Sequence, residues 1–178
     1  MSTIKILVIG PPKTGKTSIA NILADMAEGP TAQYKPTIAL RIVEFEKEPP
    51  VSTKKIFSGK VLVELWDVSG DTIYEKCWPA ILKGTQGIIF CYDPSSPSVE
   101  KDVEFFVNNF PKAGMIPPKQ CMGYANHFDV GSNALPRSKP PNCLKGVALS
   151  DATAENTSTI YMPFDRYFSH LLQIMAEK

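Results

Sequence analysis

Short apolar runs alternate with amphipathic stretches along most of the chain, and this pattern predicts a sheet covered by helices. Strands are expected at six runs rich in apolar and β-branched residues: Ile4 to Ile9, Ile38 to Glu46, Lys60 to Trp66, Gly87 to Tyr92, Cys121 to Ala125 and Val147 to Leu149. The fourth run is continuously apolar, as a central strand of a parallel sheet requires. Because a turn at Pro49-Pro50 joins the second and third runs, these two are expected to pair antiparallel.

Helices are expected between these runs, where apolar residues recur at helical spacing. The stripes are Ile19, Ile22, Leu23 and Met26 within Ser18 to Ala27; Val99, Val103, Phe106 and Phe110; and Phe164, Phe168, Leu171, Leu172 and Met175 in a last helix from about Pro163. All three are interpreted as core packing. Three prolines argue against a full helix between Val130 and Lys145. The prediction is one α/β domain over residues 1–178, with a doubly wound, mostly parallel six-stranded sheet and one antiparallel edge strand.

The loop after the first strand fits the phosphate-binding pattern G-x-x-x-x-G-K-[ST] between Gly10 and Thr17. It stands between an apolar strand and a helix, which is the context the pattern requires. Phosphate contacts are expected from Gly10, Lys13, Thr14, Gly15, Lys16, Thr17 and Ser18. Lys16 is expected to reach the β- and γ-phosphates, and the Thr17 hydroxyl to ligate Mg²⁺.

Two later segments carry groups that suit the same ligand. Thr37, in a loop after the first helix, is expected to complete the Mg²⁺ shell and to sense the γ-phosphate. Asp67 ends an apolar strand with a carboxylate suited to Mg²⁺, and Gly70 then offers an N–H group to the γ-phosphate. After the fifth strand, Asn126 to Asp129 supplies a candidate base reader, because the Asp129 carboxylate can accept from both N1–H and the exocyclic amine of guanine.

The composition argues against nucleic acid and membranes as binding partners. Nineteen basic and eighteen acidic side chains leave a net charge of +1, which gives no long-range attraction for nucleic acid or an anionic membrane. Four widely spaced cysteines lack metal-ligand spacing and are expected to be free thiols of a reducing compartment. No apolar run approaches the roughly 18 residues of a membrane helix. Because Ser2 follows Met1 and no cysteine lies near Lys178, no lipid anchor is expected, and the protein is expected to be cytoplasmic.

The phosphate loop, Thr37, the segment of Asp67 and Gly70, and the segment from Asn126 to Asp129 follow one another in the order found in the Ras-type small GTPases. The chain resembles that family from Ile4 to Lys178. The strings Gly10-Pro11, Glu64-Leu65-Trp66-Asp67, Cys77-Trp78-Pro79-Ala80 and Gln120-Cys121-Met122 are similar to the Rab-like subgroup that serves intraflagellar transport complex B. The resemblance implies a P-loop small GTPase fold with GTP or GDP and Mg²⁺ as ligands.

Two departures from the family pattern predict slow GTP hydrolysis. Asp71 stands where the family has its catalytic glutamine, and an ionised carboxylate cannot donate toward the γ-phosphate and adds charge beside it. Pro12 stands where the family has a small residue, so its ring is expected to block an arginine finger. At most weak GTPase activity is therefore expected.

Base binding also departs from the family. His127 replaces the lysine between Asn126 and Asp129, and Pro30 replaces the aromatic residue that flanks the base, so micromolar rather than picomolar affinity is expected. An ordinary loop histidine remains an equal interpretation of His127. By analogy with the family's Ser-Ala pair, Ser150, Asp151 and Ala152 are candidates for supporting the guanine carbonyl, although an ordinary strand exit explains them equally.

The resemblance implies a regulatory subunit that docks on coiled-coil subunits of intraflagellar transport complex B, in the cilium or flagellum and at its base. Residues near Thr37 and from Asp71 to Trp78 are expected to report the nucleotide state, with Trp78 either exposed beside Tyr74 as a contact or packed inward. A conventional switch in vesicle traffic and a P-loop nucleotide kinase are the alternatives. The kinase would need an arginine-rich lid, whereas Arg41, Arg137 and Arg166 are scattered.

Overall fold

A six-stranded sheet forms the centre of the computed structural model, which describes residues 2–26, 35–130 and 135–177. The strands are β1 (Ser2–Ile9), β2 (Leu40–Lys47), β3 (Val61–Val68), β4 (Gly87–Tyr92), β5 (Cys121–Asn126) and β6 (Ala148–Ala152). They lie in the order β2-β3-β1-β4-β5-β6. All pairs are parallel except β2 with β3, so β2 is the antiparallel edge strand that the sequence predicts.

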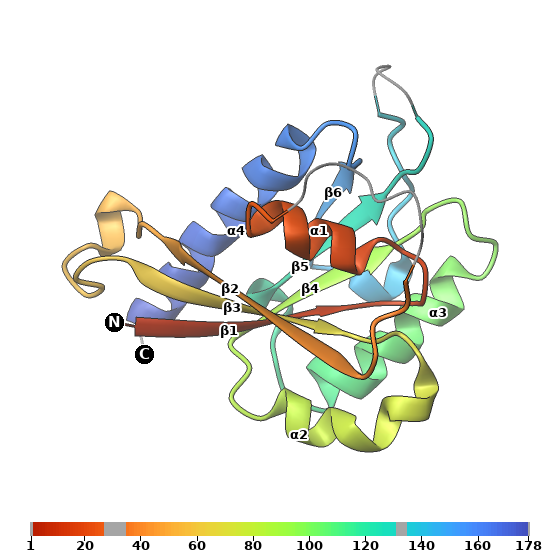
Figure 1. Cartoon of the computed structure of the whole chain (residues 1–178), viewed down its shortest axis with the longest axis horizontal. Helices are drawn as coiled ribbons and strands as arrows, with labels where there is room; N and C mark the ends of the chain where they lie inside the picture. The colour runs from red at the N-terminus through yellow and green to blue at the C-terminus, as the bar shows by residue number, and fades with distance from the viewer. Residues whose placement is uncertain (1, 27–34, 131–134, 178) are drawn as a thin grey trace.

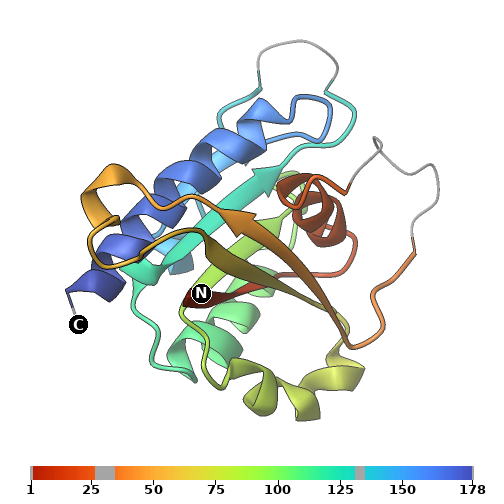
Figure 2. The same ribbon diagram turned by 60° about the vertical axis from the view of Figure 1, so that its left-hand side comes forward.

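Helices cover both faces of the sheet (Figure 1). The helices are α1 (Lys16–Leu23), α2 (Trp78–Leu82), α3 (Val99–Val107) and α4 (Ser158–Ala176). Figures 1 and 2 show α1 and α4 on one face and α2 and α3 on the other. This arrangement confirms the predicted doubly wound α/β fold. In the part of the chain that is described, no helix is both long and apolar enough to cross a membrane.

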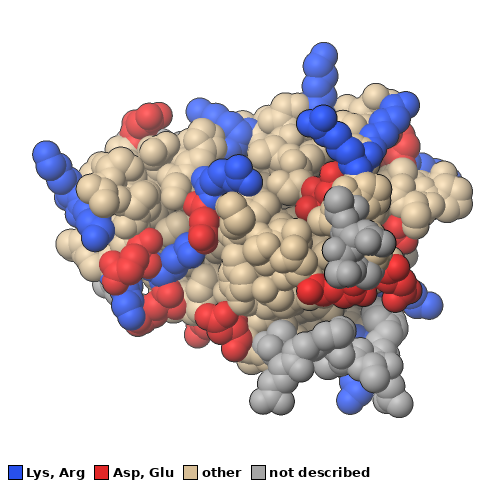
Figure 3. Space-filling model, turned by 90° about the horizontal axis from the view of Figure 1, so that it is seen from above, with Lys and Arg blue, Asp and Glu red and all other residues tan. Residues whose placement is uncertain are grey.

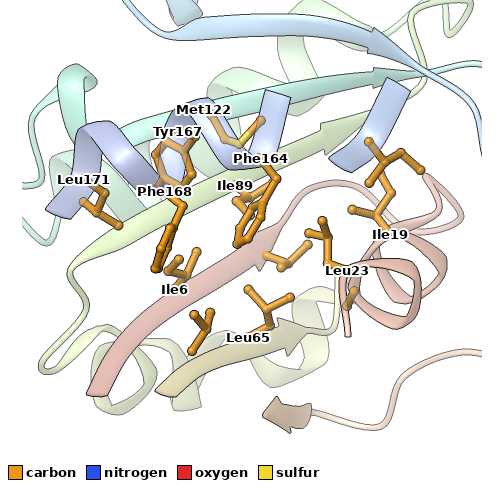
Figure 4. Close-up of a cluster of buried hydrophobic side chains, with 14 of the residues drawn as sticks. Ile6, Ile19, Leu23, Leu65, Ile89, Met122, Phe164, Tyr167, Phe168 and Leu171 are labelled. Atoms are coloured by element: carbon orange, nitrogen blue, oxygen red, sulfur yellow. The ribbon is translucent and has the colours of Figure 1, made fainter. Parts of the chain in front are cut away.

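The larger of two apolar clusters lies under α1 and α4. Phe164, Phe168 and Leu171 of α4 point toward Ile6 and Ile89 of the sheet, and Ile19 and Leu23 of α1 extend the same layer (Figure 4). Each of these side chains is at most 4% exposed. The helical stripes of the sequence are therefore core residues, except at three positions.

Met26 is one exception, because it is 61% exposed and lies beyond the end of α1 at Leu23. The chain turns at Asp25, whose φ of 52° is incompatible with a continuing right-handed helix. The other two exceptions, Met175 and Val99, are half-buried at the margins of the two clusters. The predicted helix extends to Ala27, but α1 ends at Leu23, so the prediction is wrong for the residues up to Met26. Ala27 lies outside the described residues.

The second cluster, under α2 and α3, is built around Trp78. Its side chain is 2% exposed and packs on Phe105, Phe106 and Phe110, with ring centroids 5.8, 5.8 and 4.9 Å away. Of the two orientations open from the sequence, the inward one is therefore present, and Trp78 is not a surface contact. A π-helical turn, Asn108–Lys112, follows α3 and carries the buried ring of Phe110.

Lys5 fixes the end of α2 from the neighbouring strand. Its Nζ donates hydrogen bonds to the carbonyls of Ile81 (2.6 Å) and Lys83 (2.9 Å) and lies 3.5 Å from the centroid of the Trp66 ring. Burial lowers the pKa of Lys5, against the opposing effect of Glu64. A cation at the carboxyl end of a helix satisfies carbonyls that have no partner within the helix.

The α4 helix begins earlier than the sequence predicts, at Ser158 rather than near Pro163. Its first turn is held by one tertiary and one local contact: the Tyr161 hydroxyl donates to the Ile22 carbonyl (2.5 Å), and Thr159 Oγ1 donates to the nearby Asn156 carbonyl (2.6 Å). These contacts offset the hydrogen bond that Pro163 removes from the helix.

Charge is mixed on the face shown in Figure 3, where Lys and Arg side chains are interspersed with Asp and Glu. This distribution agrees with the net charge of +1. Cys91 and Cys121 are buried, Cys143 is half-buried and Cys77 is exposed, and all four are free thiols.

Candidate functional site

The phosphate loop runs from the carboxyl end of β1 into the amino terminus of α1. Gly15 caps the helix with a φ of 85°, a left-handed conformation that favours glycine, and its carbonyl accepts from the Ile19 N–H (2.9 Å). No side chain of the described ranges caps α1, and its first turn carries no acidic residue. Its first N–H groups are thus available to an anion, which the positive end of the helix also favours.

Lys16, the first residue of α1, turns back into the loop. Its Nζ donates to the Pro11 carbonyl (2.7 Å), and the residue is 7% exposed. Burial lowers the pKa of Lys16, and the neighbouring Cys91 and Asp67 oppose that shift. A nearly buried ammonium group at the floor of an anion cradle gains a charge partner when a phosphate enters.

Thr17, Thr37 and Asp67 come together beside this cradle. The Thr17 hydroxyl donates to Asp67 Oδ2 (2.6 Å) and lies 2.9 Å from the Thr37 hydroxyl, which donates to the same Oδ2 at 3.4 Å. Asp67 is fully buried, and its Oδ1 has no hydrogen-bond partner within the described chain. Burial raises the pKa of Asp67, while Thr17, Arg41, Lys16 and Thr37 act in the opposite direction.

This oxygen set fits Mg²⁺. Two hydroxyls and a carboxylate with an unpaired oxygen are hard ligands of the type that Mg²⁺ accepts directly or through water. The three residues predicted as metal ligands, which are far apart in the sequence, thus lie in mutual contact.

Gly70 presses against the phosphate loop. A Cβ at this position would lie 2.6 Å from both the Gly10 carbonyl oxygen and the Pro12 nitrogen, so the backbone approaches too closely for any side chain. The pocket beside it has a volume of about 690 Å³. Its lining includes Lys13, Thr14, Gly15, Lys16, Thr17, Ser18, Thr37, Gly70 and Asp71.

Asp71 is exposed at the mouth of this pocket. Its carboxylate accepts a hydrogen bond from the Ile73 N–H (3.0 Å), and so caps the 3₁₀ turn Thr72–Cys77. Its own N–H donates to the Ser69 hydroxyl at 3.3 Å. Asp71 therefore has a local structural partner at the position predicted to impair catalysis. Pro12 is also exposed and lines the same pocket.

Asn126 connects the base side of the site to the phosphate loop. Its Nδ2 donates to the Thr14 carbonyl (3.0 Å), and the side chain is 3% exposed. The Cys91 thiol donates to the same carbonyl (2.9 Å). Burial raises the pKa of that thiol to about 12, so it remains a protonated donor. The residue predicted to bind guanine thus positions the loop predicted to bind phosphate.

Asp129 is differently placed. It is exposed, has a φ of 55°, and makes no hydrogen bond or ion pair with the described residues. Phe128, which precedes it, is 50% exposed and lines the same pocket as the phosphate loop. An unpaired carboxylate beside an aromatic ring suits a polar base edge, which stays a prediction for Asp129.

His127 and Asp151 are partners of each other. His127 Nε2 lies 2.9 Å from Asp151 Oδ1 and 3.1 Å from the Ser138 hydroxyl, which also contacts Asp151. Burial acts to raise the pKa of Asp151, but hydrogen bonds from His127 and Ser138 outweigh it, so the pKa is lowered. His127 is therefore neither a free loop side chain nor a stem stretched toward a base.

The other two candidates of this segment belong to a strand. β6 extends to Ala152, beyond the predicted end at Leu149, because the parallel register with β5 continues as far as Asn126. Ser150 is half-buried, and Ala152 is buried with its carbonyl accepting from the His127 N–H (2.8 Å). The prediction that these residues follow the strand is wrong. Pro30, the other base-flanking candidate, lies outside the described residues.

Sequence reasoning missed Arg41 as a member of the site. It lies opposite Asp67 in the β2–β3 pair, with its Nε 3.6 Å from Asp67 Oδ2. Antiparallel pairing was predicted, but the register that sets these two residues side by side was not.

Comparisons with known proteins agree with this geometry. Residues 5–129 match the family model described as Roc, Ras of Complex, domain of DAPkinase. The chain is 33% identical to an intraflagellar transport protein 22 homolog of Danio rerio, over 99% of this chain and 94% of that protein.

Solved structures show the same likeness. The chain superposes with a TM-score of 0.74 on a chain of the T. brucei IFT22/74/81 GTP-bound crystal structure, at 26% identity and with both chains fully covered. It also superposes on T. brucei IFT22 in its GDP-bound crystal structure, with a TM-score of 0.65 and 26% identity over 99% of this chain and 98% of that one.

Proposed function

Because the chain belongs to the Ras-like GTPases, in the family of the intraflagellar transport protein 22 homologues, we propose that it is a Rab-like, guanine-nucleotide-binding subunit of intraflagellar transport complex B. In this proposal it binds GTP or GDP with Mg²⁺, hydrolyses GTP slowly, and docks on coiled-coil subunits in the cilium or flagellum. The whole chain, residues 1–178, acts as one GTP-binding domain. Family membership also decides against the nucleotide-kinase alternative.

One observation carries the nucleotide proposal: Thr17, Thr37 and Asp67 converge beside the buried ammonium group of Lys16 at a pocket of about 690 Å³. Lys16 would exchange the Pro11 carbonyl for phosphate oxygens, and the first N–H groups of α1 would hold the same phosphates. Bound Mg²⁺ would neutralise part of the phosphate charge between Thr17, Thr37 and Asp67. Thr37 would thereby link its loop to the presence of the γ-phosphate.

Base selection is assigned to Asp129, with the base beside Phe128. The Asp129 carboxylate accepts from the two donors that guanine presents and that adenine lacks. Because Asp151 and Ser138 hold His127, the lysine stem of other family members has no counterpart free to pack on the nucleotide. This supports micromolar affinity.

Titration calorimetry with GTP, GDP and ATP tests the nucleotide proposal, together with mass spectrometry of the nucleotide and proteins that copurify from the native cell. We expect guanine nucleotides to bind at micromolar concentration and ATP to bind far more weakly. Equal affinity for ATP and GTP would contradict the proposed function, and subnanomolar GTP binding would contradict the affinity.

Slow hydrolysis is supported by the chemistry of Asp71. A glutamine both accepts from the attacking water and donates toward the γ-phosphate, whereas Asp71 is acceptor-only when ionised and is engaged by the Ile73 N–H. Exposed Pro12 at the same pocket restricts the approach of an arginine from a partner.

Replacing Asp71 with glutamine is expected to raise the rate of GTP hydrolysis at least about 10-fold, because an amide restores the donor and removes a negative charge near the γ-phosphate. Single-turnover measurements with excess protein would detect it. Asp71→Asn is the matched control, since it removes the charge but is too short to replace glutamine. Equal rates in the wild type and both variants would exclude Asp71 as the cause of slow turnover.

Partner docking is assigned to the exposed apolar side chains beside the nucleotide site. Ile38 follows Thr37 directly and is 79% exposed, and Ile73, two residues after Asp71, is 71% exposed. Apolar side chains next to nucleotide-sensing groups suit the apolar seam of a coiled coil. The T. brucei crystal structure that contains IFT22, IFT74 and IFT81 supports other intraflagellar transport subunits as the partners.

Replacing Ile73 with aspartate is expected to weaken binding of the coiled-coil subunits by at least about 10-fold, because a charge would be buried at an apolar contact. Calorimetry with the GTP-loaded protein measures it. Ile56→Asp serves as the control, since Ile56 is 59% exposed but lies between β2 and β3, away from the nucleotide. Equal losses in the two variants would argue against this docking surface.

A further inference from the structure

Arg41 joins three elements at the edge of the metal site. It lies on β2, directly opposite Asp67 of β3, and its Nη2 donates to Asn21 Oδ1 of α1 at 2.6 Å. Its Nε lies 3.6 Å from Asp67 Oδ2, the oxygen that also accepts from Thr17. The guanidinium group is therefore a fixed positive charge beside the carboxylate assigned to Mg²⁺.

Each side chain of this ion pair has a buried polar atom whose hydrogen-bonding capacity is unused within the described residues. Arg41 Nε and Asp67 Oδ1 are buried, and each lacks a hydrogen-bond partner within the described residues. A gap of 3.6 Å is too long for a hydrogen bond but short enough for strong attraction between charges. Such a pair can hold the carboxylate in place and still leave it free to bind a second cation.

A buried carboxylate needs a counter-charge. Asp67 is fully buried, and the positive groups that act on it are Arg41 and Lys16. Lys16 is held by the Pro11 carbonyl and is assigned to phosphate, so its charge is shared with the nucleotide when one is bound. Arg41 donates to the neutral Asn21 side chain on its other side, and it is not assigned to the phosphates.

We propose that Arg41 is a positioning residue that acts as a built-in counter-charge, holding Asp67 and through it Thr17 and Thr37 in the metal-binding arrangement when Mg²⁺ is absent. This inference rests on the proposed function. Its consequence is that nucleotide retention depends only weakly on Mg²⁺. Without Arg41, a bare Asp67 carboxylate would face the phosphates in metal-free protein and repel them.

The same charge acts against the metal. Arg41 and a bound Mg²⁺ would both lie beside Asp67, and two like charges at one carboxylate disfavour each other. Removing the guanidinium charge is therefore expected to tighten Mg²⁺ binding in the nucleotide complex while it speeds nucleotide loss in metal-free solution. These opposite effects separate a charge role from a general loosening of the fold.

The test is the dissociation rate of a fluorescent GDP analogue from the full chain, measured in excess Mg²⁺ and in excess chelator. In the wild type, removal of Mg²⁺ is expected to speed release less than about 10-fold. In Arg41→Gln the same ratio of rates is expected to be about 10 times larger, with the rate in Mg²⁺ close to that of the wild type. The Mg²⁺ concentration for half-maximal retention is expected to fall.

Two further variants distinguish charge from tethering. Arg41→Lys keeps the positive charge and is expected to retain the wild-type ratio of rates. Asn21→Ala removes the acceptor on α1 for the Arg41 hydrogen bond and is expected to change the ratio little. If Arg41 only ties the strands to the helix, Asn21→Ala will match Arg41→Gln and lysine will not rescue. That result would overturn the proposal.

The ratio of rates is robust to general destabilisation, because a loosened protein releases nucleotide faster in both solutions. An unchanged ratio in Arg41→Gln, with nucleotide binding intact, would overturn this inference and leave the proposed function standing. Failure of the wild type to bind the GDP analogue would overturn both.

Discussion

Replacing Asp129 with alanine is expected to lower the affinity for GTP and GDP about 100-fold or more. The carboxylate is assigned two hydrogen bonds from guanine, and bonds to a charged group contribute about 1.5–3 kcal/mol each. Losing both costs at least about 3 kcal/mol, which corresponds to roughly 100-fold in affinity. Because Asp129 is exposed and makes no bond to the described protein, the fold should be unaffected. Titration calorimetry measures the change.

A nucleotide with xanthine in place of guanine provides the control. Asp129→Asn presents an amide, which can donate to the extra carbonyl oxygen that xanthine has in place of the guanine amine. This variant is expected to lose GDP and to gain xanthosine diphosphate. If both variants keep wild-type affinity for GDP, Asp129 does not read the base.

Replacing Trp78 with alanine is expected to lower the free energy of unfolding by about 4 kcal/mol, which is within the range found when a buried tryptophan or phenylalanine is replaced with alanine. The indole is 2% exposed and contacts three phenylalanine rings, so its loss leaves a cavity at the centre of the second cluster. For a chain of this size the melting temperature should fall by roughly 10 °C. Denaturant unfolding and thermal melting followed by circular dichroism measure both quantities.

Trp78→Phe is the matched control. It keeps an aromatic ring in the cluster and removes a buried indole N–H that has no hydrogen-bond partner among the described residues, so a loss below about 1.5 kcal/mol is expected. Met115→Ala, at a side chain that is 89% exposed, should change stability by less than about 0.5 kcal/mol. A similarly small effect of Trp78→Ala would contradict the inward packing.

The sequence is most informative where local pattern and tertiary role coincide. The continuous apolar run at Gly87 to Tyr92 predicts a central strand, and β4 is indeed buried between β1 and β5. The phosphate loop is equally predictable, because its residues are contiguous and each follows from backbone geometry. Thr37 and Asp67 are predicted as isolated residues, and the structure brings them into contact, with Asp67 inside β3 one residue before its end.

Prediction fails where distant residues decide the local outcome. Pro163 indicates a helix start by local rules, yet Tyr161 bonds to Ile22 and lengthens α4 toward its amino end. Trp78 has two possible directions, and only the aromatic residues of the α3 segment select the inward one. Local sequence does not contain this information.

The site shows the same limit. Arg41 reaches Asp67 because of the strand register, which a one-residue slip would destroy. His127 and Asp151 meet because β5 and β6 are neighbours, so two residues predicted as base contacts are partners of each other.

The amide of Asn126, hydrogen-bonded to the Thr14 carbonyl, directly connects the segment after β5 to the phosphate loop. A disturbance at the purine end would thus be transmitted to the triphosphate end without passing through the nucleotide. We expect a protein that catalyses nucleotide release through β5 to loosen the phosphate loop before it disturbs Thr17, Thr37 and Asp67, the residues proposed as metal ligands.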